Sequence, residues 1–231
     1  MGADLPTDEM TEAAPAKVNL CLHVGARRPD GYHDLESLVV FTDFGDRLRL
    51  VPSDAFEVER RGTYAGGLPA DPSDDLCTRA ATGLAAVFGR EAKMRIVLDK
   101  EIPVAAGLGG GSADAAAVLR ALCRAWEIRP DDPRVVALAE ELGADVPVCL
   151  AARPSFVSGV GERVLPSSGA PSFHLLLVNP GVPLPTASVF GAHAAPAGNA
   201  AFVGPIDLSG GVAVLRDSAR NDLEGPARSL C

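Results

Sequence analysis

The sequence of 231 residues lacks a long apolar run and an excess of positive charge. No stretch approaches the length of a membrane span, and residues 1–15 are acidic where a signal peptide would be basic and then apolar. We therefore expect a cytoplasmic protein that makes no membrane contact. The formal net charge of −9 disfavours a general nucleic-acid binder, because phosphate backbones attract basic surfaces.

The sequence also lacks paired cysteines. Its five cysteines are scattered, with no C-x-x-C spacing and no adjoining histidine. This pattern disfavours a disulfide framework and a zinc site. It predicts reduced, mostly buried thiols at Cys21, Cys77, Cys123, Cys149 and Cys231.

A glycine-rich stretch between a predicted strand and a predicted helix is the most informative part of the chain. Residues 94–99 alternate like a half-buried strand, Pro103 ends it, and alanine-rich sequence with helical periodicity follows from Ser112. Free N–H groups at a helix start attract an anion such as phosphate, and glycines let a ligand come close. The stretch predicts a phosphate-binding loop; the alternative is a flexible connection that only turns a corner.

Two familiar phosphate motifs are missing from this stretch. A Walker A loop ends in Gly-Lys-Ser/Thr, which is absent, and the dinucleotide fingerprint needs a third glycine or alanine where Ser112 stands. The predicted loop is therefore of another kind. Ser112 is placed either to cap the following helix or to reach a metal ion.

Other candidate side chains lie on a strand, at a turn and at a helix end. A strictly alternating strand puts Lys17 and Asn19 on one surface, where a lysine is usually only solvated. Tyr32 and His33 follow a Pro-Asp-Gly turn and form either an ordinary hairpin tip or a stacking surface for a nucleobase. Asp145 is either a helix N-cap or a base between two helix ends.

The remaining segments predict an α+β fold in two domains. Residues 1–14 are expected to be a disordered lead, and a shift to Pro, Ser and Gly after residue 166 separates a domain at 15–166 from one at 167–231. Gly45 and Asp46 are predicted to separate two strands. The further predicted elements are strands at 38–44, 47–51 and 56–60, helices at 75–88 and 133–142, a hairpin within 156–165 and a buried strand at 173–178.

Seven segments resemble, in order, the motifs of the GHMP kinase superfamily: PAKVNLCLHV, RPDGYHDLESL, PVAAGLGGGSADAA, LGADVPVCL, FVSGVGE, NPGVPLPTASVF and RNDLE. The glycine loop resembles only the superfamily. The Asp-Gly-Tyr-His and Gly-Val-Pro-Leu-Pro-Thr segments are similar to the family of 4-diphosphocytidyl-2-C-methyl-D-erythritol kinases. The resemblance implies a GHMP kinase fold, with an N-terminal ribosomal-protein-S5-domain-2-like domain and a ferredoxin-like C-terminal domain.

The resemblance also implies an ATP-dependent kinase of non-mevalonate isoprenoid precursor biosynthesis. It would transfer the γ-phosphoryl group of ATP, with Mg²⁺, to the 2-hydroxyl of the small molecule 4-diphosphocytidyl-2-C-methyl-D-erythritol. Asp145 would take the hydroxyl proton, Lys17 would lie beside Asp145 and the hydroxyl, and Ser112 would contact magnesium or phosphate. The residues expected to hold the ATP phosphates are Pro103, Val104, Ala105, Ala106, Gly107, Leu108, Gly109, Gly110, Gly111, Ser112 and Ala113.

For the acceptor, the resemblance implies a cytosine held between the aromatic rings of Tyr32 and Phe190. His33 would hydrogen-bond to the base, and Asn19 and Thr186 would lie near the substrate. Local N–H groups, a lysine and stacking would then let an acidic protein bind two polyanions.

The chain departs from the family in one respect. Relatives carry a third glycine-serine motif near the C-terminus, and nothing after Gly161 matches it. The resemblance thus implies a C-terminally truncated member with an incomplete C-terminal domain, for which we expect exposed apolar surface and lower stability. Two alternatives stay open: a GHMP kinase with another acceptor, and a non-catalytic nucleotide-binding remnant or half of a split protein. The sequence does not indicate the oligomeric state.

Overall fold

The structure is a computed structural model that describes residues 9–71, 74–167, 172–193, 204–206, 208 and 211–231. The chain divides into two compact units that alternate along the sequence. The domain limits expected at 15–166 and 167–231 stay a prediction. Unit 1 comprises residues 1–16, 43–104 and 109–151, and unit 2 comprises residues 17–42, 105–108 and 152–231.

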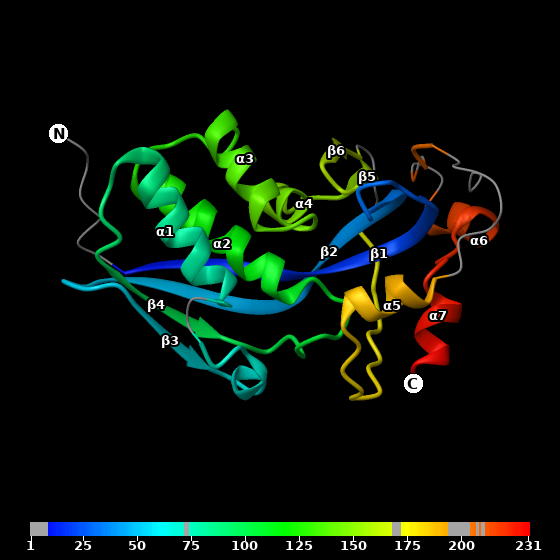
Figure 1. Cartoon of the computed structure of the whole chain (residues 1–231), viewed down its shortest axis with the longest axis horizontal. Coiled ribbons are helices and arrows are strands. Elements are labelled where there is room, and N and C mark those ends of the chain that lie inside the picture. The colour runs from blue at the N-terminus through cyan, green and yellow to red at the C-terminus, as the bar shows by residue number, and fades with distance from the viewer. Residues whose placement is uncertain (1–8, 72–73, 168–171, 194–203, 207, 209–210) are drawn as a thin grey trace. The chain divides into compact units, whose positions relative to one another are not determined.

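Two long strands, β1 (Met10–Arg27) and β2 (His33–Pro52), contribute residues to both units. They pair with each other (Figure 1). In unit 1, β2 pairs antiparallel with β4 (Met94–Asp99), which pairs parallel with β3 (Glu57–Arg61). In unit 2, β2 pairs antiparallel with β5 (Ser155–Gly159), which forms a hairpin with β6 (Arg163–Pro166).

The start of β1 corrects one prediction. The strand begins at Met10, so the expected disordered lead is wrong for residues 10–14, while residues 1–8 lie outside the described residues. Ala14 is fully buried, and the carboxylate of Glu12 accepts hydrogen bonds from Arg120 at 2.8 Å and Arg124 at 2.7 Å. These contacts with a distant helix hold the segment in place, and a short acidic, alanine-containing sequence does not reveal them.

A second correction concerns Gly45, because β2 is one continuous strand and not two. A Cβ atom at Gly45 would overlap the carbonyl oxygen of Ala14 in β1, so this position needs glycine for a close approach of two backbones. The next residue, Asp46, is buried, and its carboxylate accepts from the backbone N–H groups of Glu101 and Ile102. The Gly-Asp pair that resembles a turn in sequence therefore lies in the interior, where Gly45 allows close packing and Asp46 accepts hydrogen bonds.

The helices of unit 1 are α1 (Leu76–Phe88), α2 (Gly110–Ala125), α3 (Pro133–Leu142) and α4 (Val146–Ala151). Asp75 and Asp132 accept backbone N–H bonds as the N-caps of α1 and α3, and Gly89 ends α1 in the left-handed conformation. Helix α2 packs against α1 and α4 through an alanine-rich buried face, since small side chains let helices approach closely (Figure 1). The unit also holds a 3₁₀ turn, η1 (Ala65–Gly67).

The described residues of unit 2 also form the short helices α5 (Thr186–Ala192), α6 (Leu215–Ser218) and α7 (Glu224–Ser229), and a 3₁₀ turn, η3 (Val212–Val214). The described helical elements between residues 212 and 229 are short. Residues 220–222 lie beside β1, because the N–H of Leu22 donates to the carbonyl of Arg220 at 2.8 Å and the N–H of Asp222 to the carbonyl of Leu22 at 2.9 Å. The RNDLE segment is thereby fastened to the same strand that carries Lys17 and Asn19.

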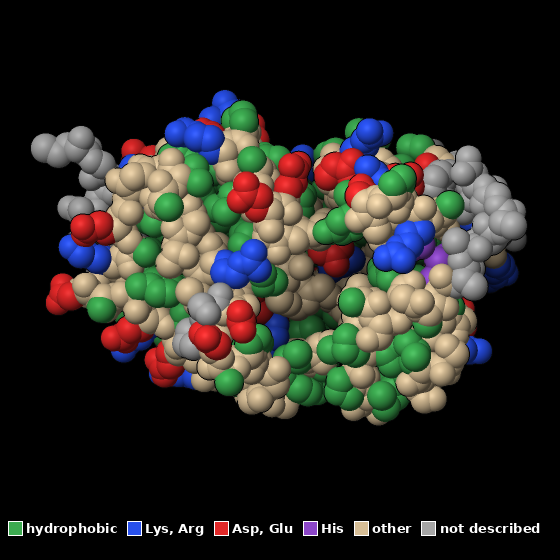
Figure 2. All heavy atoms as spheres, in the orientation of Figure 1, with side chains coloured by type: hydrophobic (Ala, Val, Ile, Leu, Met, Phe, Trp, Pro, Cys, Tyr) green, Lys and Arg blue, Asp and Glu red, His purple; other side chains and the backbone are tan. Residues whose placement is uncertain are grey.

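The buried strand predicted at 173–178 is wrong. Residues 172–180 belong to no strand, and Leu176 and Val178 are 89% and 84% exposed. Figure 2 shows hydrophobic atoms over the region where this segment lies in Figure 1. The apolar run is present as expected, but no described strand pairs with it, so Leu175, Leu176 and Val178 stay exposed while Phe173 and Leu177 are half-buried. Within the described residues, none of the helices is both long and apolar enough to span a membrane.

Candidate active site

The glycine-rich loop leads from the end of β4 into α2, as the sequence predicts. Ala105, Gly107 and Gly109 have positive φ angles of 57°, 73° and 64°. A Cβ atom at Gly107 would meet no heavy atom within 4 Å, so this part of the loop faces open space. Helix α2 begins at Gly110, and its N-cap is Gly109, which has no side chain to satisfy the first N–H groups. The loop thus leaves N–H groups at a helix start for an anion.

The helix start also settles one alternative for Ser112. Its side chain does not cap α2, because the N-cap position is Gly109 and no side-chain cap bond is present. Ser112 lies in the first turn and is half-buried. Its contact with phosphate or a metal ion stays a prediction.

A buried charge cluster that the motifs did not predict lies at the base of the loop in unit 1. The Nζ atom of Lys100 donates to carboxylates of Asp46 and Asp114, each at 2.6 Å, and all three side chains are buried. Lys100 directly follows β4 and Asp114 lies in the first turns of α2, so the pair ties the two flanks of the loop together. A Cβ atom at Gly110 would come within 2.9 Å of Nζ of Lys100. The glycine is needed for this packing.

Burial sets the protonation of this cluster. The pKa of Asp114 is raised to about 8, because desolvation and the nearby Asp46 raise it by more than the ammonium of Lys100 lowers it. Burial alone would lower the pKa of Lys100, but the two carboxylates outweigh it and raise that pKa. The Oδ1 atom of Asp114 is buried and has no hydrogen-bond partner in the described part of the chain. The cluster thus holds two acidic groups and one ammonium, and Asp114 keeps its proton below about pH 8.

We expect this cluster to make the free energy of unfolding fall as pH rises from about 5 to about 8. In this interval folded Asp114, with its pKa raised from 3.8 to about 8, binds a proton that the unfolded chain releases. Its contribution is complete below pH 3.8 and is lost as pH passes through about 8. Urea unfolding of the wild type and of Asp114→Asn at several pH values measures it. The wild type should lose up to about 1.4 kcal/mol per pH unit relative to the variant; equal slopes would contradict the prediction.

Lys17 lies beside the glycine loop in unit 2. Its backbone N–H donates to the carbonyl of Leu108 at 2.9 Å, and its side chain is only 5% exposed. The Nζ atom donates to Oδ1 of Asn19 at 3.0 Å. The simple interpretation of Lys17 as a solvated lysine is therefore wrong. The side chains of Lys17 and Asn19 thus lie together, and the backbone of Lys17 is bound to Leu108 of the loop.

The predicted base-binding residues also belong to unit 2. The rings of His33 and Phe190 lie 5.8 Å apart between centroids, and Nδ1 of His33 is 2.9 Å from the carbonyl oxygen of Gly25. Thr186 is exposed at the start of α5, the helix that carries Phe190. Tyr32 is 60% exposed and forms no ring contact with another described residue. The structure brings His33 and Phe190 together, and the stacking role of Tyr32 stays a prediction.

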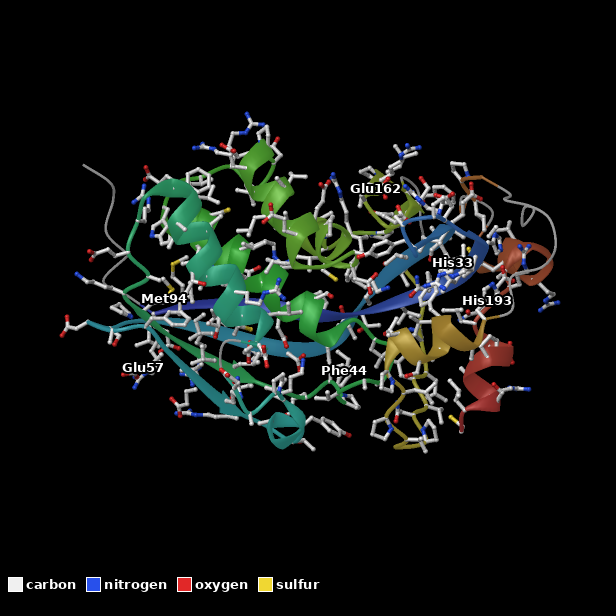
Figure 3. All side chains as sticks on the ribbon, in the orientation of Figure 1. His33, Phe44, Glu57, Met94, Glu162 and His193 are labelled. Atoms are coloured by element: carbon white, nitrogen blue, oxygen red, sulfur yellow. The ribbon has the colours of Figure 1, made fainter. Side chains whose placement is uncertain are left out.

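His193, which the sequence analysis did not single out, lies beside His33. Their ring centroids are 5.8 Å apart in an edge-to-face arrangement (Figure 3). His193 follows α5 directly, so it comes one turn after Phe190. No spacing rule connects it with His33, because the two lie far apart in the chain.

The loop that precedes α5 is also fastened to the glycine loop. The N–H of Leu184 donates to the carbonyl of Ala105 at 3.0 Å. We call Tyr32, His33 and Phe190 the aromatic group. Unit 2 therefore contains residues 105–108 of the glycine loop, Lys17, Asn19 and this aromatic group.

Asp145 belongs to unit 1, where it stands between α3 and α4. Its carbonyl oxygen accepts the N–H of Cys149 at 3.1 Å, which starts α4, and its side chain is half-buried. The expected position between two helix ends is confirmed. That Lys17 lies beside Asp145 stays a prediction.

Comparison with known proteins places this arrangement among kinases. The family model for the GHMP kinases N terminal domain matches residues 75–153, which contain the glycine loop and Asp145. A 4-diphosphocytidyl-2-C-methyl-D-erythritol kinase of Gluconacetobacter diazotrophicus is 47% identical over 97% of this chain and 77% of its own length. The enzyme of the same name from Paracoccus denitrificans is 49% identical over 95% of this chain and 74% of its own length.

A solved structure supports the same relationship. The crystal structure of a 4-(cytidine 5'-diphospho)-2C-methyl-D-erythritol kinase has a TM-score of 0.71 to this chain. It is 36% identical and covers 96% of this chain and 78% of the other. The GHMP kinase fold expected from the sequence is confirmed.

Proposed function

The chain belongs to the family of 4-diphosphocytidyl-2-C-methyl-D-erythritol kinases, and we propose that it transfers the γ-phosphoryl group of ATP to the 2-hydroxyl of 4-diphosphocytidyl-2-C-methyl-D-erythritol. One observation carries the proposal: relatives of that name are 47% and 49% identical over 97% and 95% of the chain. The kinases with other acceptors and the non-catalytic alternative are less favoured, since this similarity extends over both units. We place the reaction in cytoplasmic isoprenoid precursor synthesis.

For ATP, we assign the phosphates to the loop at 103–113. The open space above Gly107 and the uncapped N–H groups at the start of α2 fit a polyphosphate. Within the described residues no cluster of three histidine, cysteine or acidic side chains could hold a metal ion. We assign Mg²⁺ to phosphate oxygens and the hydroxyl of Ser112, where it would neutralise phosphate charge.

For the acceptor, we assign chemistry to Asp145 and positioning to Lys17 and Asn19. The carboxylate of Asp145 takes the proton of the 2-hydroxyl while the hydroxyl oxygen of the acceptor bonds to the γ-phosphorus of ATP. The bond between the γ-phosphorus and the β,γ-bridging oxygen breaks, and ADP is released. The ammonium of Lys17 stabilises the negative charge on the transferring group. Buried and held by Asn19, it needs little reorganisation during the reaction.

We assign the cytosine to the aromatic group of unit 2. Tyr32 and Phe190 stack on the base, His33 hydrogen-bonds to it, and Thr186 lies near the diphosphate-linked part. The ring contact between His33 and Phe190 supports this assignment, because both would touch one planar ligand.

Acceptor-dependent ATP consumption tests the proposed function. The purified chain with ATP and Mg²⁺ should produce ADP only when 4-diphosphocytidyl-2-C-methyl-D-erythritol is present, and the phosphorylated product should appear in equal amount. Mevalonate, homoserine and a hexose serve as control acceptors. Turnover with one of these, and none with the cytidyl compound, would refute the substrate.

Replacement of Tyr32 tests the cytidine assignment. Tyr32→Ala should raise the KM for the acceptor about tenfold, because one stacked base contributes about 1–3 kcal/mol, while the KM for ATP stays unchanged. The chain has two tyrosines, and Tyr64, which is 39% exposed, provides the matched control. Tyr64→Ala should leave the KM for the acceptor unchanged. An unaltered acceptor KM in Tyr32→Ala would remove the support for cytidine binding.

A further inference from the structure

Ser37 lies in the middle of β2, between two neighbouring strands of unit 2. Its backbone is in register with Val157 of β5, and its hydroxyl reaches β1 on the other side. The next residue, Leu38, donates its N–H to Sγ of Cys21 in β1 at 3.4 Å. The side chain of Ser37 is only 1% exposed. A hydroxyl in such a place has few alternative partners, so its hydrogen bonds are set by the fold.

The direction of these hydrogen bonds follows from the groups involved. The Oγ atom of Ser37 lies 2.7 Å from the carbonyl oxygen of Cys21 and 2.7 Å from Nδ2 of Asn19. A carbonyl oxygen can only accept, so the hydroxyl proton points to Cys21. Towards Asn19 the hydroxyl can then only accept. It therefore selects the amide orientation in which the NH₂ group of Asn19 faces Ser37.

The ammonium of Lys17 contacts the other end of the same amide. With the NH₂ group turned to Ser37, Oδ1 of Asn19 lies 3.0 Å from Nζ of Lys17 and accepts its proton. An ammonium can only donate. A flipped amide would place NH₂ against the ammonium, which would lose this hydrogen bond and be pushed away from its position.

We propose that Ser37 is a positioning residue for phosphoryl transfer, whose hydroxyl fixes the amide of Asn19 and, through it, the ammonium of Lys17. The inference rests on the proposed function, in which Lys17 and Asn19 act on the acceptor side. Ser37 acts through Asn19 and is not itself a catalytic residue. A misplacement of about 1 Å in a positioned group can cost up to about 100-fold in rate.

Two variants of nearly equal shape isolate the hydroxyl. Ser37→Thr keeps it and Ser37→Val replaces it with a methyl group, while both add the same extra methyl group to the buried site. We expect kcat to be about tenfold lower in Ser37→Val than in Ser37→Thr, with the KM for ATP equal in the two. A loss of fold would lower the active fraction and leave the remaining enzyme normal, so active-site titration of each variant separates the two effects.

A double-mutant cycle tests whether Ser37 acts through Asn19. In an Asn19→Ala background, single-turnover rates of the Ser37→Thr and Ser37→Val variants should be equal, because the group that Ser37 orients is gone. Equal kcat values for the two variants in the Asn19 background would overturn the inference alone. A tenfold difference that persists in the Asn19→Ala background would overturn it as well. No acceptor-dependent turnover in the wild type would overturn the proposed function and the inference together.

Discussion

Asp145→Ala is expected to lower kcat for acceptor-dependent ATP consumption by about 10²–10⁴-fold, the range of general base catalysis. The variant removes the group assigned to take the proton of the acceptor hydroxyl. It leaves the glycine loop intact, so nucleotide binding should persist. Rapid-quench measurement of phosphorylated product, with fluorescent nucleotide titration in parallel, measures both effects. Full activity in Asp145→Ala would refute the mechanism.

Asp132 offers a matched control for this experiment. Both aspartates directly precede a helix, and Asp132 caps α3 by accepting the N–H of Arg134 at 2.9 Å. Asp132→Ala should cost about 1 kcal/mol of stability through the lost cap. Its kcat should not change. A similar loss of kcat in both variants would mean that the effect of Asp145→Ala comes from a damaged helix start.

Lys100→Met is expected to destabilise unit 1 by about 3–5 kcal/mol, because it leaves the buried carboxylate of Asp46 without its cation. Methionine fits the space of the lysine stem, so the variant removes the charge with little change in volume. Lys100 is 1% exposed and contacts Asp46 and Asp114. Urea unfolding at pH 7, followed by circular dichroism, measures the loss.

Two comparisons make the Lys100 result specific. Lys93→Met alters an exposed lysine directly before β4 and should change the free energy of unfolding by less than about 0.5 kcal/mol. Lys100→Met combined with Asp46→Asn should recover part of the loss, since no buried carboxylate is then left without its cation at pH 7. A loss below about 1 kcal/mol in Lys100→Met would contradict the view that the cluster holds the flanks of the glycine loop.

The glycine loop and the helices around it could be predicted from the sequence because their signals are local. Helical periodicity, the caps Asp75 and Asp132, and glycines before an alanine-rich run each act within a few residues. The GHMP kinase fold followed from motif order, which the comparisons confirm. Only its motif predicts Lys17 as a site residue, because strand alternation alone predicts a solvated side chain, whereas both faces of β1 are largely covered.

The features that could not be predicted depend on contacts distant in sequence. Gly45 and Asp46 are residue types typical of turns. Gly45, however, lets the backbone of β1 come close, and Asp46 accepts hydrogen bonds from backbone N–H groups more than 50 residues away. Ser37 gives no signal of its own, because its role depends on which strand lies beside it. For Asp114 the sequence does contain a signal, because it is a single charged residue among alanines on the buried face of α2. Residues 173–178 have strand composition, but composition does not supply a pairing partner.

The alternation of the two units along the chain has a consequence for biosynthesis. Unit 1 is complete once residue 151 has left the ribosome, whereas residues 17–42 of unit 2 are made early and need residues 152–231. During that interval the strand segments that carry Lys17, Asn19 and Ser37 have emerged without β5 and the RNDLE segment that flank them in the finished protein. Lys17, Asn19 and Ser37 are thus synthesised early, and their strand segments gain these neighbours only when the later residues have emerged.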